Sequence, residues 1–227
     1  GLYPIEIYQI GLAYSNDGIN FIKYNDPIND INPLYQNSDP VIRIPYTLGG
    51  MPDTINYLFS SVAEPSIMYD SISNTFKIWY IGLGCSNPNC IGISDFRYRI
   101  LYSESLDGIN WSSPVLSLDI GSIGDFDSKL IYAPHVIKIG VDYWMFYGGN
   151  TFISGTFSLF SQKIGLAISA DGINFSKISN NPIITNGSNG TWDYLGTNYP
   201  SSIVYKDTLR VYYSGMQDSL FNFTPNI

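Results

Sequence analysis

The chain has 227 residues, of which 44% are hydrophobic and only 13% are charged, and its formal net charge is −8. This balance excludes a disordered chain, because disordered segments are poor in apolar residues and rich in charge. The eleven Lys and Arg residues form no basic stripe, which argues against nucleic acid as a partner. The sequence has no run of 18 apolar residues and therefore predicts no membrane span.

The composition is typical of strands and tight turns. Tyr (19), Phe (12) and Gly (21) are abundant, whereas the residues that usually fill helices are scarce. A chain of this length can bury the core of one domain. We therefore expect an all-β fold and treat residues 1–227 as a single domain.

A seven-residue phrase occurs three times, as SNDGINF at 15–21, SLDGINW at 105–111 and SADGINF at 169–175. Its Asp-Gly pair predicts a tight turn, because Gly adopts a positive φ without penalty, and the leading Ser can cap the turn through its hydroxyl. The closing aromatic side chain can pack between neighbouring sheets. We interpret the three Asp residues as turn formers rather than catalysts: Asp17, Asp107 and Asp171.

Other markers repeat in the same order as the phrase. An apolar strand precedes each phrase, at 10–15, 100–105 and 164–169. A proline opens a short apolar run, at Pro65, Pro134 and Pro200. An aromatic strand ending in Gly follows, at 77–82, 143–149 and 209–215. Meanders of about four short antiparallel strands, repeated with one period, are the signature of a β-propeller.

Together, these markers resemble the five-bladed β-propellers of glycoside hydrolase family 43 and its relatives, families 32 and 68. The resemblance covers nearly the whole chain and implies four-stranded antiparallel blades whose inner strands line an axis. Residues 22–62 are its least typical part and are expected to form an inter-blade region or a degenerate blade.

The repeat is about 67 residues long, so the chain holds about three recognisable blades. It opens on the outer half of one unit and closes on the inner half of another, and such halves can be joined in one blade where a ring closes. We expect the chain to be a fragment of a longer propeller; the alternative is a degenerate blade within 22–62.

The resembling enzymes place three carboxylates from successive inner strands around the scissile bond. One carboxyl must be protonated while another stays ionised. The resemblance assigns the general acid to Glu64, directly before Pro65, although the family order is Glu-x-Pro and a one-residue shift turns a side chain to the other face. A hydrogen-bonded strand-end Glu is the alternative. Asp127 and Asp193, each seven residues before its Pro, are candidates for the base or orienting residue, with turn capping as the alternative.

The remaining candidates are aromatic, histidine and cysteine side chains. His135 is a candidate substrate ligand or a plain hydrogen-bonding residue. Trp111 and Trp192 are candidates for sugar stacking, with core packing as the alternative. Cys85 and Cys90 share a short polar loop and are expected to form a disulfide in an oxidising compartment, although two free thiols remain an alternative. No metal site or cofactor is expected, since two Cys and one His are too few for structural zinc; an axial calcium ion is not indicated.

The leading functional hypothesis is hydrolysis of glycosidic bonds by a pair of carboxylates, with an oligosaccharide or polysaccharide as partner. The rival is a non-catalytic carbohydrate-binding or structural propeller module. Under either hypothesis the expected location is extracellular or at the cell surface, and the remainder of a longer chain or another subunit is a further candidate partner.

Overall fold

The computed structural model describes residues 8–29, 37–43, 58–85, 96–151 and 161–217, and nearly all regular secondary structure in this part of the chain is β-strand. Its single helical element is a short 3₁₀ turn, η1 (Pro27–Asn29). None of the described helices is long and apolar enough to cross a membrane. The expected all-β fold is confirmed.

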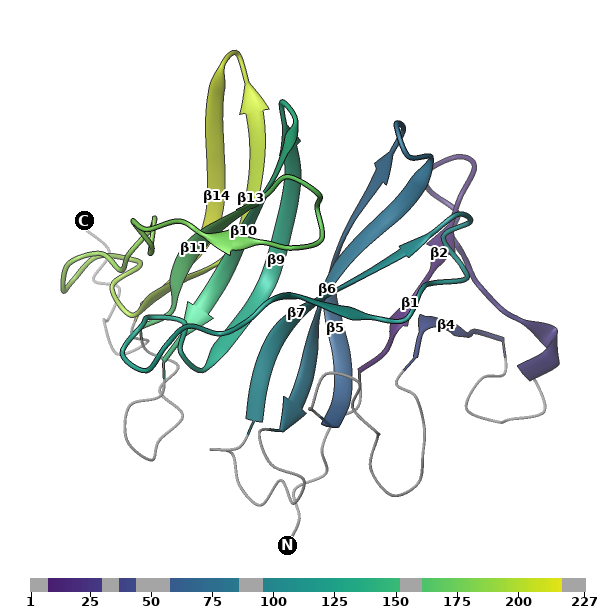
Figure 1. Ribbon diagram of the computed structural model, residues 1–227, viewed down its shortest axis with the longest axis horizontal. Helices are drawn as coiled ribbons and strands as arrows, with labels where there is room; N and C mark the ends of the chain where they lie inside the picture. Colours follow the sequence, from purple (N-terminus) through teal and green to yellow (C-terminus); the bar gives the residue numbers. More distant parts are fainter. Residues whose placement is uncertain (1–7, 30–36, 44–57, 86–95, 152–160, 218–227) are drawn as a thin grey trace, which may run out of the picture.

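Two complete four-stranded antiparallel meanders form the centre of the molecule (Figure 1). The first consists of β5 (Leu58–Asp70), β6 (Thr75–Cys85), β7 (Phe96–Ser105) and β8 (Val115–Leu118). The second consists of β9 (Leu130–Ile139), β10 (Asp142–Asn150), β11 (Lys163–Ser169) and β12 (Ser176–Lys177). One parallel bridge, Tyr98 to Leu130, joins them. Each meander corresponds to one repeat of the sequence.

Half-meanders flank this centre at opposite ends of the array (Figure 1). The inner half, a hairpin of β13 (Gly196–Tyr205) and β14 (Thr208–Met216), lies beyond the second meander. The outer half lies beyond the first and consists of β1 (Ile10–Gly11), β2 (Ala13–Tyr14), β3 (Ile22–Lys23) and β4 (Pro40–Ile42). Among the described residues, no strand pairing joins the two halves.

The segment 22–62 is only partly described. Its strand β4 pairs antiparallel with β1, with Ile10 opposite Ile42. The second meander has the same arrangement, since Ile164 is bridged to Ile184. The described part of the segment thus extends the outer half-unit, and the degenerate blade stays a prediction.

The core lies between the meanders, where their faces pack together. The largest cluster joins Trp79 and Tyr102 of the first meander to Met145 and Tyr147 of the second, and all four side chains are buried. A second cluster packs β6 and β7 of the first meander against Ile10 and Ile42 of the outer half-unit. The alternation of inward and outward side chains along each strand places an apolar face toward both neighbours.

The repeated phrase forms the same turn three times. In the first copy the Asp17 carboxylate accepts hydrogen bonds from the Ser15 hydroxyl and from the amides of Ile19 and Asn20. The corresponding bonds occur around Asp107 and Asp171. The turn glycines all have positive φ: Gly18 (74°), Gly108 (76°) and Gly172 (74°). The predicted structural role of these Asp residues is confirmed.

The turn formed by residues 169–175 also contacts the preceding meander. The Trp79 indole donates a hydrogen bond to the Gly172 carbonyl, and the Phe175 ring meets the Trp79 ring edge-on, with centroids 6.3 Å apart. Phe175 is 8% exposed, whereas its counterpart Phe21 in the outer half-unit is 63% exposed. The aromatic residue of the phrase is therefore buried where a preceding meander is present.

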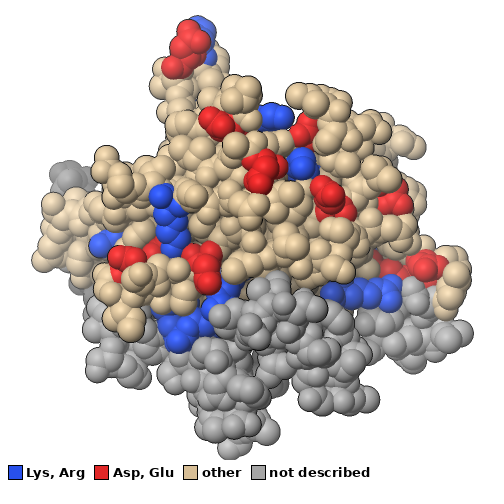
Figure 2. All heavy atoms as spheres, viewed as in Figure 1, with Lys and Arg blue, Asp and Glu red and all other residues tan. Residues whose placement is uncertain are grey.

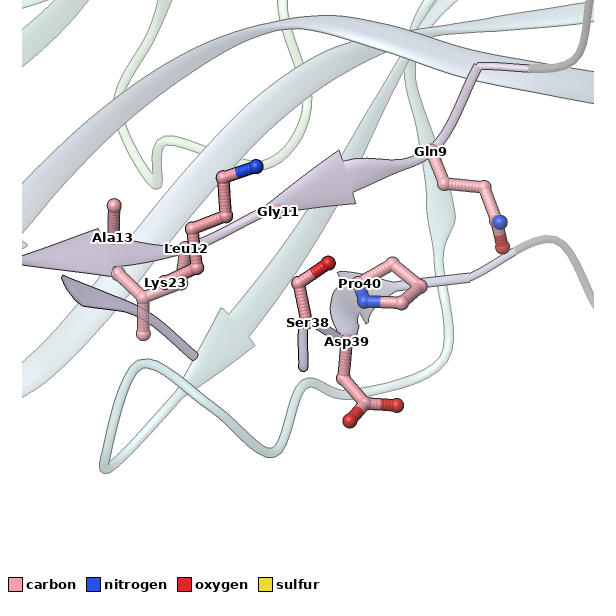
Figure 3. A pocket seen from close by; sticks show the side chains of 8 residues that line it. All are labelled: Gln9, Gly11, Leu12, Ala13, Lys23, Ser38, Asp39 and Pro40. Atoms are coloured by element: carbon pink, nitrogen blue, oxygen red, sulfur yellow. The ribbon is translucent and has the colours of Figure 1, made fainter. Parts of the chain in front are cut away.

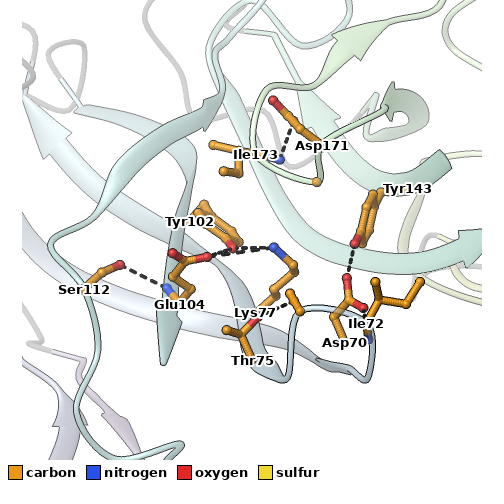
Figure 4. A network of polar contacts seen from close by, with 12 residues as sticks. Asp70, Ile72, Thr75, Lys77, Tyr102, Glu104, Ser112, Tyr143, Asp171 and Ile173 are labelled. Atoms are coloured by element: carbon orange, nitrogen blue, oxygen red, sulfur yellow. Dashed lines mark hydrogen bonds and ion pairs between the residues drawn. The ribbon is translucent and has the colours of Figure 1, made fainter. Parts of the chain in front are cut away.

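Polar side chains also contribute to the interface between the two meanders (Figure 4). Tyr143 on β10 donates a hydrogen bond to the carboxylate of Asp70, which ends β5, and Lys138 Nζ lies 3.5 Å from the same oxygen. The Tyr143 hydrogen bond is the largest of several interactions that lower the pKa of Asp70 from 3.8 to about 2. The ionised form of Asp70 therefore stabilises the contact between the two meanders.

This contact predicts a pH dependence of stability. A lowered carboxyl pKa contributes stability that is present above the ordinary value of 3.8 and is lost as pH falls toward about 2. We expect the free energy of unfolding of Asp70→Asn to fall less steeply than that of the parent across this window. Denaturant unfolding at pH 5 and at about pH 3 measures the difference. Equal slopes for the two proteins would contradict the assignment.

Candidate functional site

The heads of the three inner strands share an uncommon backbone geometry. The residue before each repeated proline has a positive φ: Glu64 (54°), Ala133 (48°) and Tyr199 (49°). The strand register shifts at the same point in β5, β9 and β13. A positive φ in a non-glycine residue costs about 1–3 kcal/mol, and such residues cluster at functional sites. A β-bulge also changes the direction in which the side chain of the bulged residue points. Each inner strand thus presents one redirected side chain.

Of the three, only Glu64 places a carboxylic acid at this redirected position. Its carboxylate oxygen Oε2 accepts a hydrogen bond from the Ala133 amide of the neighbouring inner strand, at 2.6 Å. The side chain is half-buried. Burial raises the pKa of Glu64 above its usual value, and the Ala133 amide offsets only part of that shift. The carboxyl is thereby biased toward its protonated form.

Tyrosine side chains surround this carboxyl. Tyr132 is 7% exposed, and its hydroxyl has no hydrogen-bond partner among the described residues. Burial raises the pKa of Tyr132, and the nearby Tyr199 and Glu64 add to the shift. The same three causes raise the pKa of Tyr98. A buried hydroxyl without a partner leaves a donor and acceptor for a bound molecule or water.

Tyr199 adds an exposed ring to the group. Its ring centroid lies 6.2 Å from that of Tyr132, and its side chain is 56% exposed. The site therefore combines a half-buried acid, a buried hydroxyl and an accessible aromatic face. This combination suits a ligand with many hydroxyl groups and a flat apolar face, such as a sugar.

Hydrogen bonds also link neighbouring inner strands just after the repeated prolines. Val136 donates its amide hydrogen to the Ser66 hydroxyl at 3.0 Å. His135, directly after Pro134, lies with Nε2 3.0 Å from the Ser202 carbonyl on β13. A bond to a backbone carbonyl is what a structural histidine forms, and the predicted ligand role of His135 remains a prediction.

Asp127 and Asp193 occupy equivalent positions within their own repeats. The Tyr147 hydroxyl donates to Asp127 at 2.9 Å, and the Tyr213 hydroxyl donates to Asp193 at 3.1 Å. Asp127 also forms an ion pair with Lys177, 2.6 Å away. Among the described residues, no hydrogen bond or ion pair connects either aspartate to Glu64. These contacts are those of scaffold residues, and the catalytic role predicted for both remains a prediction.

The scaffold role makes a testable distinction between the two aspartates. Asp127→Asn removes the charge opposite Lys177, whereas Asp193 has no ion pair in the described part of the chain. We expect Asp127→Asn to lose about 2 kcal/mol more unfolding free energy than Asp193→Asn, a value reduced by the partial exposure of Lys177. Chemical denaturation of both variants measures it. Equal losses would show that the ion pair does not support the fold.

The predicted stacking residues lie away from the Glu64 contacts. Trp111 is half-buried against the cluster that contains Ile10 and Ile42. Trp192 is 54% exposed and stacks on Tyr213, with centroids 5.5 Å apart. Both stay predictions as sugar ligands. Cys90 and the Cys85 side chain lie outside the described residues, and so does their proposed disulfide.

Sequence reasoning missed Tyr132 and Tyr98. Tyr132 stands two residues before the repeated proline of its unit, and the same position in the other two units holds Ala63 and Asn198. Departure from the repeat is the signal that singled out Glu64, and it would have identified Tyr132 too. Tyr98 gave no such signal, since only the bridge between β7 and β9 brings it to this end of the strands.

Charged side chains do not gather into one field on the face seen in Figure 2, where acidic and basic groups are interspersed among large uncharged areas. Among the described residues, no group of three or more His, Cys, Asp or Glu could hold a metal ion. The site of interest is therefore defined by Glu64 and its tyrosines rather than by a strong net charge.

Comparison with known proteins identifies the fold. No family model matches the chain. A thermostable family 43 glycoside hydrolase aligns with 90% of this chain and 56% of its own, at 23% identity and a TM-score of 0.62. A family 117 glycoside hydrolase of Zobellia galactanivorans aligns over 74% and 52%, at 17% identity and a TM-score of 0.58. The chain has the β-propeller fold of these glycoside hydrolases.

A further relative belongs to the same fold but carries a different activity in its name. An A type blood N-acetyl-α-D-galactosamine deacetylase of Flavonifractor plautii is 26% identical over 175 residues. This match covers 70% of the present chain but only 21% of the relative, and the chain spans about half of the solved propellers. The predicted likeness to glycosidase propellers is confirmed, and the number of blades beyond the described units stays a prediction.

Proposed function

We propose that this propeller is directed at glycans and cleaves glycosidic bonds, with Glu64 as the general acid. The observation that carries the proposal is the position of Glu64 on a redirected inner-strand head, where burial raises its pKa. A general acid must be protonated when the leaving-group oxygen departs, and enzymes raise a glutamate pKa by burial for that purpose.

The surroundings of Glu64 support a sugar as the bound group. The Tyr132 hydroxyl has no hydrogen-bond partner among the described residues, and the exposed Tyr199 ring lies beside the Tyr132 ring. A sugar hydroxyl would complete the hydrogen bonding of Tyr132 while the sugar face packs on Tyr199. The names of the fold neighbours, glycoside hydrolases and a carbohydrate deacetylase, favour the same class of ligand.

Cleavage also needs a second carboxylate, as base or nucleophile. The aspartates Asp127 and Asp193 are held within their repeats by Tyr147 and Tyr213. The proposal therefore assigns the acid to this chain and does not depend on either aspartate as its partner.

A non-catalytic carbohydrate-binding module is the second candidate, and one observation favours it. The Glu64 carboxylate bonds to the Ala133 amide and so joins two inner strands. A structural glutamate would form the same bond.

A panel of aryl arabinosides, xylosides and fructosides and of N-acetylgalactosamine-containing oligosaccharides separates the two candidates. Release of the aryl alcohol reports glycoside cleavage, release of acetate reports deacetylation, and calorimetry reports binding. Glycoside cleavage supports the leading proposal. Binding without turnover supports the second candidate, and neither binding nor turnover across the panel contradicts both.

A further inference from the structure

The sequence contains five pairs in which an aspartate or asparagine is followed by glycine, and all five lie in described loops and turns. They are Asp17-Gly18, Asp107-Gly108, Asp171-Gly172, Asn186-Gly187 and Asn189-Gly190. In such a pair the glycine amide nitrogen can approach the side-chain carbon Cγ of the residue before it, because glycine has no Cβ to obstruct the approach. The hydrogen bonds of each pair decide whether the fold permits this approach.

Hydrogen bonds hold the glycine amide in four of the five pairs. In the three Asp-Gly turns this amide donates to the serine hydroxyl of the repeated phrase, at 2.9–3.0 Å. The Gly187 amide donates to the Asp193 carbonyl at 3.4 Å, and Asn186 Nδ2 donates to the Tyr194 carbonyl at 3.1 Å. An amide held in this way must break its bond before it can react.

The pair Asn189-Gly190 has no such bond. Among the described residues, no hydrogen bond forms to the Gly190 amide or to the Asn189 side chain. The turn is closed on either side of the pair, since the Thr191 amide and hydroxyl both donate to the Ser188 carbonyl. Gly190 has a φ of 92°, and Asn189 is exposed. The pair therefore forms the tip of a short turn, and its own polar groups are not held.

The exposure of this tip follows from the shape of the loop. The loop of residues 187–193 (GSNGTWD) repeats that of residues 121–127 (GSIGDFD), and Gly124 has a φ of 103° at the position of Gly190. Ile123 stands at the position of Asn189. It is 103% exposed, although the first meander and the β13–β14 hairpin flank its own meander (Figure 1). A unit with a neighbour on each side therefore still exposes this position.

We propose that Asn189 is a site of spontaneous deamidation, in which the Gly190 amide nitrogen attacks the Asn189 side chain. A bond forms between that nitrogen and Cγ, the bond from Cγ to Nδ2 breaks, and the proton of the Gly190 amide leaves with Nδ2 as ammonia. Water then opens the cyclic imide at either carbonyl and gives aspartate or isoaspartate. Nothing is oxidised or reduced, and water is the only co-reactant.

The product changes the loop that holds Asp193. Deamidation adds a negative charge at residue 189, and isoaspartate also adds a methylene group to the backbone of the turn. The Thr191 hydroxyl donates to the Asp193 carboxylate at 2.9 Å, and the same carboxylate accepts the Tyr213 hydroxyl. The modification therefore occurs beside a contact that fixes the start of the β13–β14 hairpin.

An Asn-Ser pair provides a comparison outside this loop. Asn37 is exposed and has a positive φ of 67°. The side chain of Ser38, the next residue, lies at a hollow of about 410 Å³ in the outer half-unit (Figure 3). Ser38 carries a Cβ beside its amide nitrogen, and this Cβ obstructs the attack that glycine permits. We expect Asn37 to react more slowly than Asn189.

Peptide mapping tests the site. The folded chain is incubated in mildly alkaline buffer made with water that carries a heavy oxygen isotope, so that each conversion incorporates labelled oxygen. Tandem mass spectrometry of the tryptic peptide 178–206 locates the conversions at both Asn-Gly pairs, and the peptide 24–43 reports Asn37. We expect the rate at Asn189 to exceed that at Asn186 by about ten-fold, which corresponds to about 1.4 kcal/mol for the hydrogen bonds that hold the Asn186 pair.

Two controls separate the effect of the fold from that of the dipeptide. In guanidinium chloride the hydrogen bonds of Asn186 are lost, so the two Asn-Gly pairs should react at nearly equal rates. Asn189→Ile copies the residue of the equivalent loop. We expect this variant to keep the melting temperature of the parent and the slow conversion at Asn186, and to lose the fast conversion.

Two results would overturn the proposal. Conversion at Asn186 or Asn37 that is as fast as at Asn189 in the folded chain would show that the turn does not select the site. An Asn189 that stays intact in the folded chain, while the unfolded chain converts, would show that the fold protects this pair as well.

Discussion

Glu64→Gln is expected to lower the rate of glycoside cleavage by about 10²–10⁴-fold, the contribution that a positioned proton donor makes. Glutamine has nearly the shape of glutamic acid, and its carbonyl oxygen can still accept the Ala133 amide. It has no proton to donate to the leaving group. The substitution therefore removes the chemistry and leaves the strand contact in place, so the melting temperature should stay close to that of the parent.

The pH profile of the parent provides a second readout of the same residue. The raised pKa of Glu64 keeps the acid protonated to higher pH than an ordinary glutamate, so the alkaline limb of kcat/KM should lie above the usual glutamate range. Stopped assays on the best substrate of the panel measure both the rate of glycoside cleavage and the pH at which kcat/KM falls on the alkaline side. An unchanged rate for Glu64→Gln would remove Glu64 from the mechanism.

Trp79→Ala is expected to cost about 3–5 kcal/mol of unfolding free energy, the range for truncating a large buried aromatic side chain. Trp79 is fully buried between the two complete meanders, and its indole hydrogen bond to the Gly172 carbonyl would also be lost. Because domains are stable by only about 5–15 kcal/mol, this change removes a large part of the total.

Trp192→Ala is the control for that prediction. Its ring is 54% exposed and stacks on Tyr213, so its removal deletes one aromatic contact and creates no buried cavity. We expect a loss of about 1 kcal/mol. Urea unfolding of both variants gives the comparison. A Trp79→Ala variant that is no less stable than Trp192→Ala would contradict the packing of the meanders described here.

The repeat and its turns could be predicted from the sequence, because both depend on residues that are close together along the chain. Ser15, Asp17 and Gly18 form their turn through bonds that span only a few residues, and the three copies fold alike. The inner and aromatic strands were also predicted, since their apolar runs have no competing helical pattern. One exception is the strand of residues 10–15, which is interrupted at Leu12.

The candidate site was less predictable, because it depends on contacts between repeats. The positive φ of Glu64 comes from a bulge that has no sequence signal beyond the following proline. The partners of Asp127 lie on β10 and β12, at sequence distances that no motif specifies. Tyr212 is 61% exposed although its counterpart Phe146 is buried, because no described element covers that face of β14.

A sugar is expected to bind beside Glu64, Tyr132 and Tyr199. The most direct measurement is a crystal structure of Glu64→Gln soaked with the oligosaccharide that the panel selects. We predict a sugar oxygen within hydrogen-bonding distance of the residue 64 side chain, a second bond to the Tyr132 hydroxyl, and a sugar ring against Tyr199. A sugar bound elsewhere on the propeller, with these three side chains unoccupied, would contradict the proposed site.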